Sequence, residues 1–197
     1  MHTDEAIKPR IYGGIDPGAD GAAVLRFGPF SRVIRGVEYH DADGRVVPEA
    51  LRMALWTAEQ SLTIEAVDSL PKDAPLPLVV LVVEDYVTIP GQGLASQAKA
   101  AHNAGVIRGV VASMGRDWTC HLGLTHSGRG GWRSLAGIRK RSGDKGCIKR
   151  ATIRHVRDEL PGIDLRPGRC TTDQDGIADA AGMSLAAEAI DRREREG

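Results

Sequence analysis

The sequence predicts an α/β fold in which helices cover a central sheet. Five segments have the composition of strands, at 11–15, 21–27, 31–39, 78–86 and 118–125, and helical patterns alternate with the later ones. Six consecutive branched apolar residues, Leu78 to Val83, indicate a strand that is buried on both faces. The chain of 197 residues is long enough for one substantial core, so we expect a single domain over residues 1–197.

The first two strands are predicted to form a hairpin that presents one acid. Ile11 to Ile15 is a short apolar run, and Asp16-Pro17-Gly18 ends it with turn residues. The chain then returns as a second strand, Gly21 to Phe27. Asp16 is therefore expected at the end of a central strand. A single Asp before a turn is usually only turn chemistry, but two later segments also carry acids in apolar surroundings.

The middle of the chain supplies helices and a second acid. A helix begins at Pro48, with apolar residues at helical spacing (Leu51, Leu55, Trp56 and Ala58). The buried strand that follows it ends in Glu84 and Asp85. A second helix, Ser96 to Met114, has a row of small residues four apart: Ala101, Gly105, Gly109 and Ser113. Glycine inside a helix costs about 1 kcal/mol relative to alanine, so the row indicates the close approach of another backbone, either the protein's own sheet or a second copy.

The last helix supplies two more acids. Its apolar, alanine-rich body runs to Ile190. Asp175 and Asp179 are four residues apart, so they share a helix face with Cβ atoms about 5–6 Å apart and repel one another unless a cation lies between them. Asp175 could also be an N-cap, whereas Asp179 lies a full turn inside the helix. Residues 1–9 and 191–197 are expected to be flexible, which leaves a core at about 11–190.

The segment from His126 to Arg157 is strongly basic within a neutral chain. It contains ten Lys and Arg residues and one acid, Asp144, whereas the whole chain carries 26 basic and 26 acidic residues. Charge asymmetry of this kind is typical of a surface that binds phosphates. A solvated helix face is the simpler explanation, but it accounts poorly for ten cations beside one anion. We therefore expect a nucleic-acid-binding segment at 126–157.

Cysteine usage and apolar runs limit the cellular setting. Cys120, Cys147 and Cys170 are widely spaced and contain no C-x-x-C pair, which favours reduced thiols over disulfides or a zinc cluster. Residues 1–8 have no apolar core of a signal peptide, and the longest apolar run is too short to cross a membrane. We expect a cytoplasmic protein without membrane partners.

The acids indicate metal chemistry. They come from two strands and one helix: Asp16, Glu84, Asp175 and Asp179. Carboxylates are hard oxygen ligands suited to Mg²⁺ or Mn²⁺. Two such ions about 3.5–4 Å apart can activate a water and stabilise the leaving oxygen of a phosphodiester. Acids for metal ions, together with a basic surface for phosphates, form the composition that a nuclease requires.

Three motifs together resemble a known family. The stretches GGIDPGADGAAV (13–24), LVVLVVEDY (78–86) and DGIADAAGMSLAA (175–187) resemble the RuvC-type Holliday junction resolvases of the RNase H-like superfamily. The stretch WRSLAGIRKRSGDKGCIKRA (132–151) is similar to bacteriophage-type members more than to cellular ones. The likeness covers most of residues 11–190. Sugar kinases and actin-like ATPases share the first motif, but the three motifs in this order are fairly specific.

The resemblance implies an RNase H-like mixed five-stranded sheet flanked by helices on both faces. It also implies a homodimer and a site in which four acids hold two Mg²⁺ or Mn²⁺ ions. The matching acids are Asp16, Glu84 and Asp179. The fourth acid of cellular members commonly lies three residues before the last, which here is Gly176. Asp175 is the nearest candidate, with Asp173 or water as a substitute.

The resemblance further implies a junction-resolving endonuclease. Two protomers would nick opposing strands of a four-way DNA junction symmetrically, with a metal-activated water leaving a 5′-phosphate and a 3′-hydroxyl. The DNA contacts expected on this basis are Gln92, Lys99, Arg133, Lys140, Arg141, Lys145, Lys149 and Arg150. Trp132 either stacks on a base or anchors its loop, and we favour the anchor. A phage-encoded member would act in the cytoplasm of a bacterial host.

Three alternatives stay open. One is another nuclease of the same fold, acting on RNA–DNA hybrids, flaps or replication forks. The second is a branched-DNA-binding protein with weak or no catalysis, suggested by Gly176 at the position of the fourth acid. The third, a sugar kinase or ATPase, would require a second glycine-rich phosphate turn and a duplicated domain, and the sequence contains neither.

Overall fold

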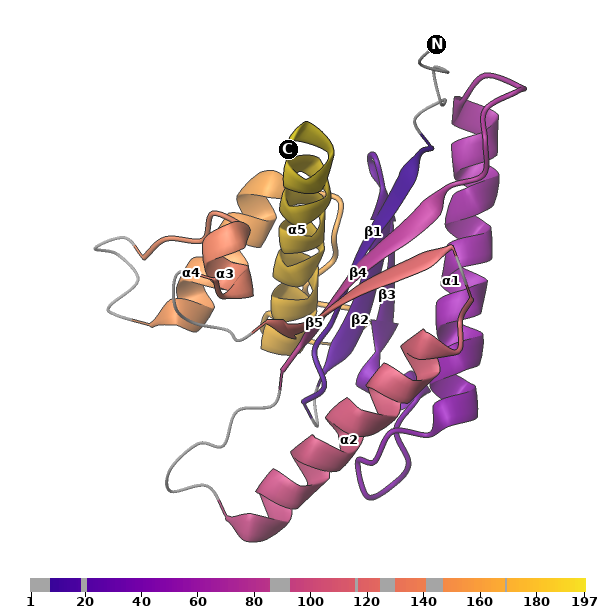
Figure 1. The fold of residues 1–197 in the computed structure, drawn as a ribbon. Helices are drawn as coiled ribbons and strands as arrows, with labels where there is room; N and C mark the ends of the chain where they lie inside the picture. The colour runs from indigo at the N-terminus through magenta and orange to yellow at the C-terminus, as the bar shows by residue number, and fades with distance from the viewer. Residues whose placement is uncertain are drawn as a thin grey trace.

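The computed structural model describes residues 8–18, 21–85, 93–115, 117–124, 130–140, 147–168 and 170–197, with a five-stranded sheet at the centre (Figure 1). The strands are β1 (Arg10–Ile15), β2 (Ala22–Phe27), β3 (Phe30–Arg35), β4 (Leu78–Glu84) and β5 (Trp118–Leu124), in the spatial order β3-β2-β1-β4-β5. The β1–β2 and β2–β3 pairs are antiparallel, whereas β1–β4 and β4–β5 are parallel. The predicted mixed five-stranded α/β sheet is confirmed, and the arrangement is compatible with the RNase H-like class.

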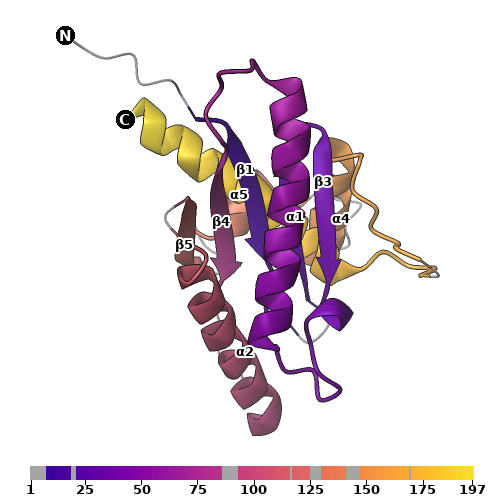
Figure 2. The same ribbon diagram turned by 90° about the vertical axis from the view of Figure 1, so that its right-hand side faces the viewer.

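Helices cover both faces of the sheet (Figure 2). On one face lie α1 (Pro48–Ser69) and α2 (Leu94–Ala112); on the other lie α3 (Trp132–Leu135), α4 (Ile148–Glu159) and α5 (Asp175–Glu196). Side chains of the strands alternate between the two layers. Ile11 and Leu81 pack towards α1 and α2, whereas Val24 and Val82 pack towards the other helices. The apolar run of β4 is therefore buried on both sides, as predicted.

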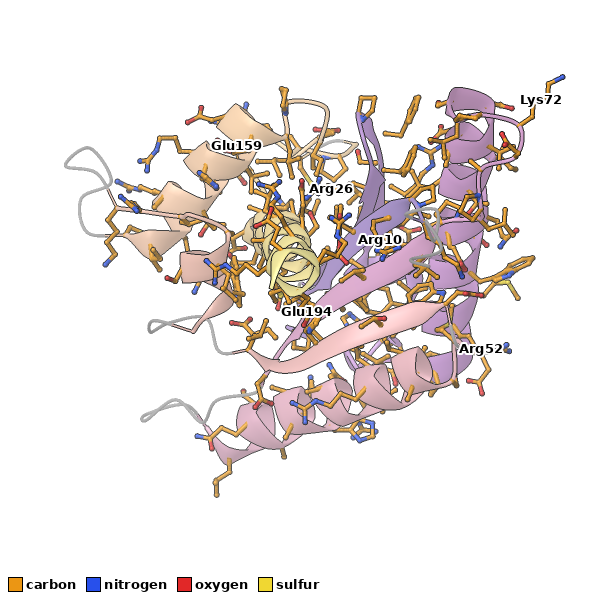
Figure 3. The ribbon with its side chains drawn as sticks, turned by 45° about the horizontal axis from the view of Figure 1, so that its top comes forward. Arg10, Arg26, Arg52, Lys72, Glu159 and Glu194 are labelled. Carbon is orange, nitrogen blue, oxygen red and sulfur yellow. The ribbon has the colours of Figure 1, made fainter. Side chains whose placement is uncertain are left out.

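The C-terminal boundary predicted at residue 191 is wrong. α5 continues to Glu196, and Asp191 is only 6% exposed. The Asp191 carboxylate accepts hydrogen bonds from Arg10 Nε at 3.2 Å and from the Tyr12 hydroxyl at 2.9 Å. Arg10 and Arg26 both lie beside α5 (Figure 3). A charged helix end looks detached in sequence, but here the strands supply its counter-charges. The predicted flexible start falls mostly on residues 1–7, outside the described residues.

Three other elements differ from the predicted pattern. The third strand ends at Arg35, and η1 (Gly36–Glu38) follows it. The Gly36 carbonyl accepts the N–H groups of Tyr39 and His40 at 3.0 and 2.8 Å, which turns the backbone out of the sheet. α1 extends to Ser69, well beyond its predicted pattern, and α3 is a short helix in a segment expected to be a loop.

The row of small residues on α2 faces away from the sheet. Asn103 and Ile107 are among the buried positions of this helix, whereas Gly105 and Gly109 are exposed. A Cβ atom at either glycine would meet no described atom within 4 Å beyond its own helix turn. Packing of this row on the protein's own sheet is therefore excluded. The close approach of a second copy stays a prediction.

Two further observations bear on the setting of the protein. Within the described ranges, no helix is both long and apolar enough to cross a membrane. Cys120, Cys147 and Cys170 carry free thiols, as expected. Burial raises the pKa of the Cys120 thiol to about 11, so this group is a poor nucleophile at neutral pH.

α5 crosses β1 at a contact that only glycine permits. A Cβ atom on Gly14 would lie 2.2 Å from the backbone oxygen of Ala180 and 2.5 Å from Met183 Cβ, closer than non-bonded atoms can approach. The contact holds the first turns of α5 against the last residues of β1. Asp179, which precedes Ala180, is thereby set beside the strand end that carries Asp16.

We expect Gly14→Ala to lower the free energy of unfolding by about 3 kcal/mol or more, because the added methyl group would overlap backbone atoms that cannot move aside. Gly162→Ala is the matched control. Its methyl group would make only an ordinary contact, 3.7 Å from the backbone oxygen of Pro29, and should change the free energy of unfolding by less than about 1 kcal/mol. Urea unfolding followed by circular dichroism measures both. Equal effects of the two substitutions would contradict the close contact.

Candidate metal centre

The ends of β1 and β4 place two acids side by side. The strands are parallel neighbours, and Ile15 pairs with Val83 in their register. Asp16 and Glu84, the next residues, therefore lie at the same carboxyl edge of the sheet. Ligand sites of open α/β sheets are commonly built at this edge, because loops and helix ends meet there.

The N-terminal turns of α5 bring two more acids to this edge. Asp179 is well enclosed, with its side chain 13% exposed, whereas the Asp175 side chain is 43% exposed. The difference follows from the helix position, since Asp175 begins α5 and Asp179 lies one turn further, beside the Gly14 contact. The structure therefore brings together all four acids that the sequence singled out, with Asp175 at the rim.

The pKa of the Asp16 carboxyl group reflects both its burial and the neighbouring acids. Burial, together with the negative charges of Glu84, Asp179 and Asp175, raises the pKa of Asp16 to about 7. The backbone N–H of Gly18 donates to Asp16 Oδ1 at 2.9 Å and opposes this rise. A carboxyl group with such a pKa is held in an environment that disfavours further negative charge. A cation at this edge would relieve that cost.

Two basic side chains neutralise the acids of α5. Arg133 Nη2 donates to Asp179 Oδ2 at 2.9 Å, and Lys149 Nζ forms an ion pair with Asp175. Burial raises the pKa of Asp179 in spite of its arginine partner, whereas the hydrogen bond from Lys149 lowers the pKa of Asp175. The more buried acid of the two thus carries the greater electrostatic cost.

Glu84, the acid at the end of β4, accepts a hydrogen bond from an indole. Trp132 Nε1 donates a hydrogen bond to Glu84 Oε1 at 3.1 Å, and the Trp132 side chain is fully buried. Base stacking by Trp132 would require an exposed ring. The prediction that Trp132 anchors its segment is therefore confirmed. Its contact with an acid of the site has no signal in the sequence.

Two neighbouring acids belong to other clusters. Asp85, next to Glu84, forms an ion pair with Arg108 of α2. Asp173 binds Arg157 at 2.6 Å and Arg166 at 2.8 Å, and both of its carboxylate oxygens are engaged. Asp173 is therefore a poor substitute for the fourth ligand, and Asp175 stands closer to the other acids.

The carboxylate oxygens are suitable ligands for a hard divalent cation, although the four side chains are not arranged around one common ion position. Asp179 Oδ1 is buried and finds no hydrogen-bond partner among the described residues, which leaves an acceptor for a cation. Within the described ranges, no group of three or more His, Cys, Asp or Glu side chains is arranged to hold a metal ion as it stands. Arg133 and Lys149 each engage one oxygen of Asp179 and Asp175, respectively, in an ion pair. Ion binding therefore requires these carboxylates to exchange partners.

The predicted DNA contacts divide into three groups. Lys99, Lys140, Lys149 and Arg150 have at least part of their side chains in solvent, although Lys149 is paired with Asp175. Gln92, Arg141 and Lys145 lie outside the described residues. Arg133 was predicted as a phosphate contact, and that role does not fit the structure. It is 8% exposed and is held by Asp179, because its position on α3 directs it into the site.

A second basic surface lies on α2, on the other side of the sheet from α4. Arg45, Lys99 and His102 line a hollow of about 450 Å³ together with two alanines of α2. Lys99 Nζ also donates to the backbone oxygen of Asp43 at 2.5 Å, which ties the 41–47 turn to the helix. Sequence reasoning missed Arg45, because a lone arginine after a turn is far from the basic segment.

We expect Asp16 to make a contribution to the stability of the metal-free protein that is lost as pH rises from about 4 to 7. In that window the unfolded chain has lost the Asp16 proton while the folded protein retains it, so raising the pH favours unfolding. Asp16→Asn removes this effect, which is on the order of 3 kcal/mol for a carboxyl pKa raised this far. Thermal melts in EDTA at pH 5 and pH 8 measure it. Asp68→Asn, at an exposed position of α1, is the control, and equal pH slopes for both variants would contradict the assignment.

Comparisons with known proteins give no match from which a function could be inferred. No family model matches the sequence, and no curated protein matches it. The grouping of acids and cations described above is therefore the basis for a proposal about function.

Proposed function

We propose that this protein is a divalent-metal-dependent endonuclease that resolves branched DNA, with four-way junctions as its foremost substrate. One observation carries the proposal: acids from β1, β4 and α5 meet at one edge of the sheet, where burial and the charges of the neighbouring acids raise the pKa of Asp16 to about 7. The resemblance of the three acidic motifs to RuvC-type resolvases supports the same activity and the same order of ligands.

The chain's own groups prepare the site for Mg²⁺ or Mn²⁺. The expected ligands are Asp16, Glu84, Asp179 and Asp175. Two ions held by them would supply the activation of a water and the stabilisation of the leaving oxygen. The Gly18 N–H orients Asp16, and the backbone contact at Gly14 holds α5 in place. Arg133 and Lys149 keep two carboxylates neutralised until they exchange partners.

Cations on both faces of the sheet support binding of a polyanion. Lys140 and Arg150 are exposed near α3 and α4, whereas Arg45 and Lys99 lie on the opposite face, beside α2. The sheet that carries the acidic edge lies between the layer of α3 and α4 and the layer of α2 (Figure 1). A DNA backbone that reaches this edge from either face would be drawn towards the acids by cations that do not themselves neutralise the site.

Paired nicks require two sites, and α2 offers a surface on which a second copy could pack. The row that contains Gly105 and Gly109 is exposed, and Leu94 at the start of the helix is 85% exposed. Small residues allow helix backbones to approach closely, and an exposed leucine gains from burial. The homodimer is part of the proposal.

A second candidate function is binding of branched DNA without cleavage. The observation that favours it is the pairing of Asp179 with Arg133 and of Asp175 with Lys149, which neutralises half of the acids. A protein that retained these pairs in the presence of Mg²⁺ would bind DNA phosphates but hold no ion. Both candidates use the same basic surfaces, so cleavage itself distinguishes them.

We expect Asp16→Asn and Glu84→Gln to abolish cleavage of an immobile four-way junction, because each removes an expected ligand of the metal ions. Junction binding should stay intact or become tighter, because each substitution removes a group that can carry negative charge next to the bound phosphates. Cleavage in Mg²⁺ and gel-shift affinity in EDTA measure the two effects separately. Asp68→Asn on α1 is the control and should behave as the unaltered protein.

The same assay should include a fork, an RNA–DNA hybrid and a linear duplex. The proposal expects the junction to be cut fastest, and preference for the linear duplex would end it. Cleavage that continues unchanged in either acid variant would contradict the metal centre. Tight junction binding by the unaltered protein without cleavage of any substrate would favour the binding-only function.

A further inference from the structure

Two consecutive residues of α3 contact two different acids of the candidate metal centre. Trp132 donates to Glu84 of β4 at 3.1 Å, and Arg133 donates to Asp179 of α5 at 2.9 Å. We propose that Trp132 is a positioning residue, which fixes the Glu84 carboxylate in the orientation that binds the metal ion. The inference rests on the proposed function, because it concerns the same site.

The packing around Trp132 holds its indole ring in one orientation. The side chain is fully buried in the layer between the sheet and α5. A Cβ atom at Gly182 of α5 would lie 2.7 Å from the indole ring, so the helix is in direct contact with one part of it. The Arg133 guanidinium lies 4.4 Å from the ring centroid and stacks on it. The indole therefore cannot turn without unpacking α3 from α5, and the direction of its N–H is fixed.

An indole N–H is suited to orient a metal ligand. It is a neutral donor, so it restricts the Glu84 side chain without cancelling the negative charge that a cation requires. Partners that hold a metal-binding side chain from behind typically change metal affinity by about 10–100-fold when they are removed. Arg133 differs in this respect, because its positive charge competes with a metal ion for Asp179. The two neighbours thus have distinct roles: Trp132 orients a ligand, and Arg133 neutralises one.

A comparison of tryptophan with phenylalanine distinguishes a positioning role of Trp132 from a role in packing alone. A phenylalanine would fill much of the same space between the sheet and α5, but it has no group that reaches Glu84 Oε1. A purely structural role predicts lower stability when the ring is changed and unaltered metal affinity in the protein that remains folded. A positioning role predicts weaker metal binding even where the fold is intact.

The test is the Mn²⁺ affinity of Trp132→Phe, measured by the electron paramagnetic resonance signal of free Mn²⁺ at a temperature well below the melting point. We expect the affinity to fall about tenfold or more. Trp118→Phe is the matched control. Trp118 is nearly buried and hydrogen-bonds Glu59 on the opposite face of the sheet, so this variant also loses a tryptophan–glutamate contact. Its Mn²⁺ affinity should stay within about twofold of the unaltered protein's.

A second substitution removes the N–H with almost no change of shape. Trp132→benzothienylalanine replaces the indole nitrogen by sulfur, and it should weaken Mn²⁺ binding by a similar factor with little loss of melting temperature. This variant decides the matter if Trp132→Phe does not fold. Mn²⁺ affinity equal to that of the unaltered protein would overturn the positioning role of Trp132. Absence of Mn²⁺ binding in the unaltered protein would instead overturn the proposed function, so the two failures are distinguishable.

Discussion

Four carboxylates lie at one edge of the sheet, and their mutual repulsion has to be offset for the fold to persist. Burial, together with the charges of the other three acids, raises the pKa of Asp16 to about 7. Arg133 and Lys149 offset part of the repulsion by pairing with the acids of α5. Acids whose pKa values are shifted by burial and by neighbouring charges are frequent at functional sites. The electrostatics of this edge are therefore the strongest indication of function in the molecule.

The fold produces this concentration of charge through two backbone features. Parallel pairing of β1 and β4 in a register that aligns Ile15 with Val83 brings the two strand acids to one level. The contact at Gly14 allows α5 to approach β1 until backbone touches backbone, which carries Asp179 to the same level. The residues that make both contacts are buried. The acids are thus positioned by the core rather than by loops.

Much of the fold and the grouping of acids follows from sequence patterns alone. Strands, helices and turns have local signatures, and acids at the ends of buried strands indicate a shared edge. The roles of Trp132 and Arg133 could not be predicted in this way. An arginine within a basic segment has the same local pattern whether it meets a phosphate or a buried carboxylate. Only the packing of α3 against α5 decides between them.

The C-terminal end of α5 also could not be predicted from local sequence patterns. Residues 191–197 have the composition of a detached polar tail, yet α5 continues because Asp191 is bound by Arg10 and Tyr12 from β1. These partners are about 180 residues away in the chain, and no local pattern indicates them. Pairing of charges over such separations is a property of the folded chain, which is why the boundary was misplaced.

Anomalous diffraction from a crystal grown with Mn²⁺ tests the central claim most directly, because it locates ions independently of any reaction. The account predicts anomalous peaks between Asp16, Glu84 and Asp179, with the Arg133 guanidinium displaced from Asp179. Peaks confined to other parts of the molecule, with the Arg133–Asp179 ion pair intact, would contradict it.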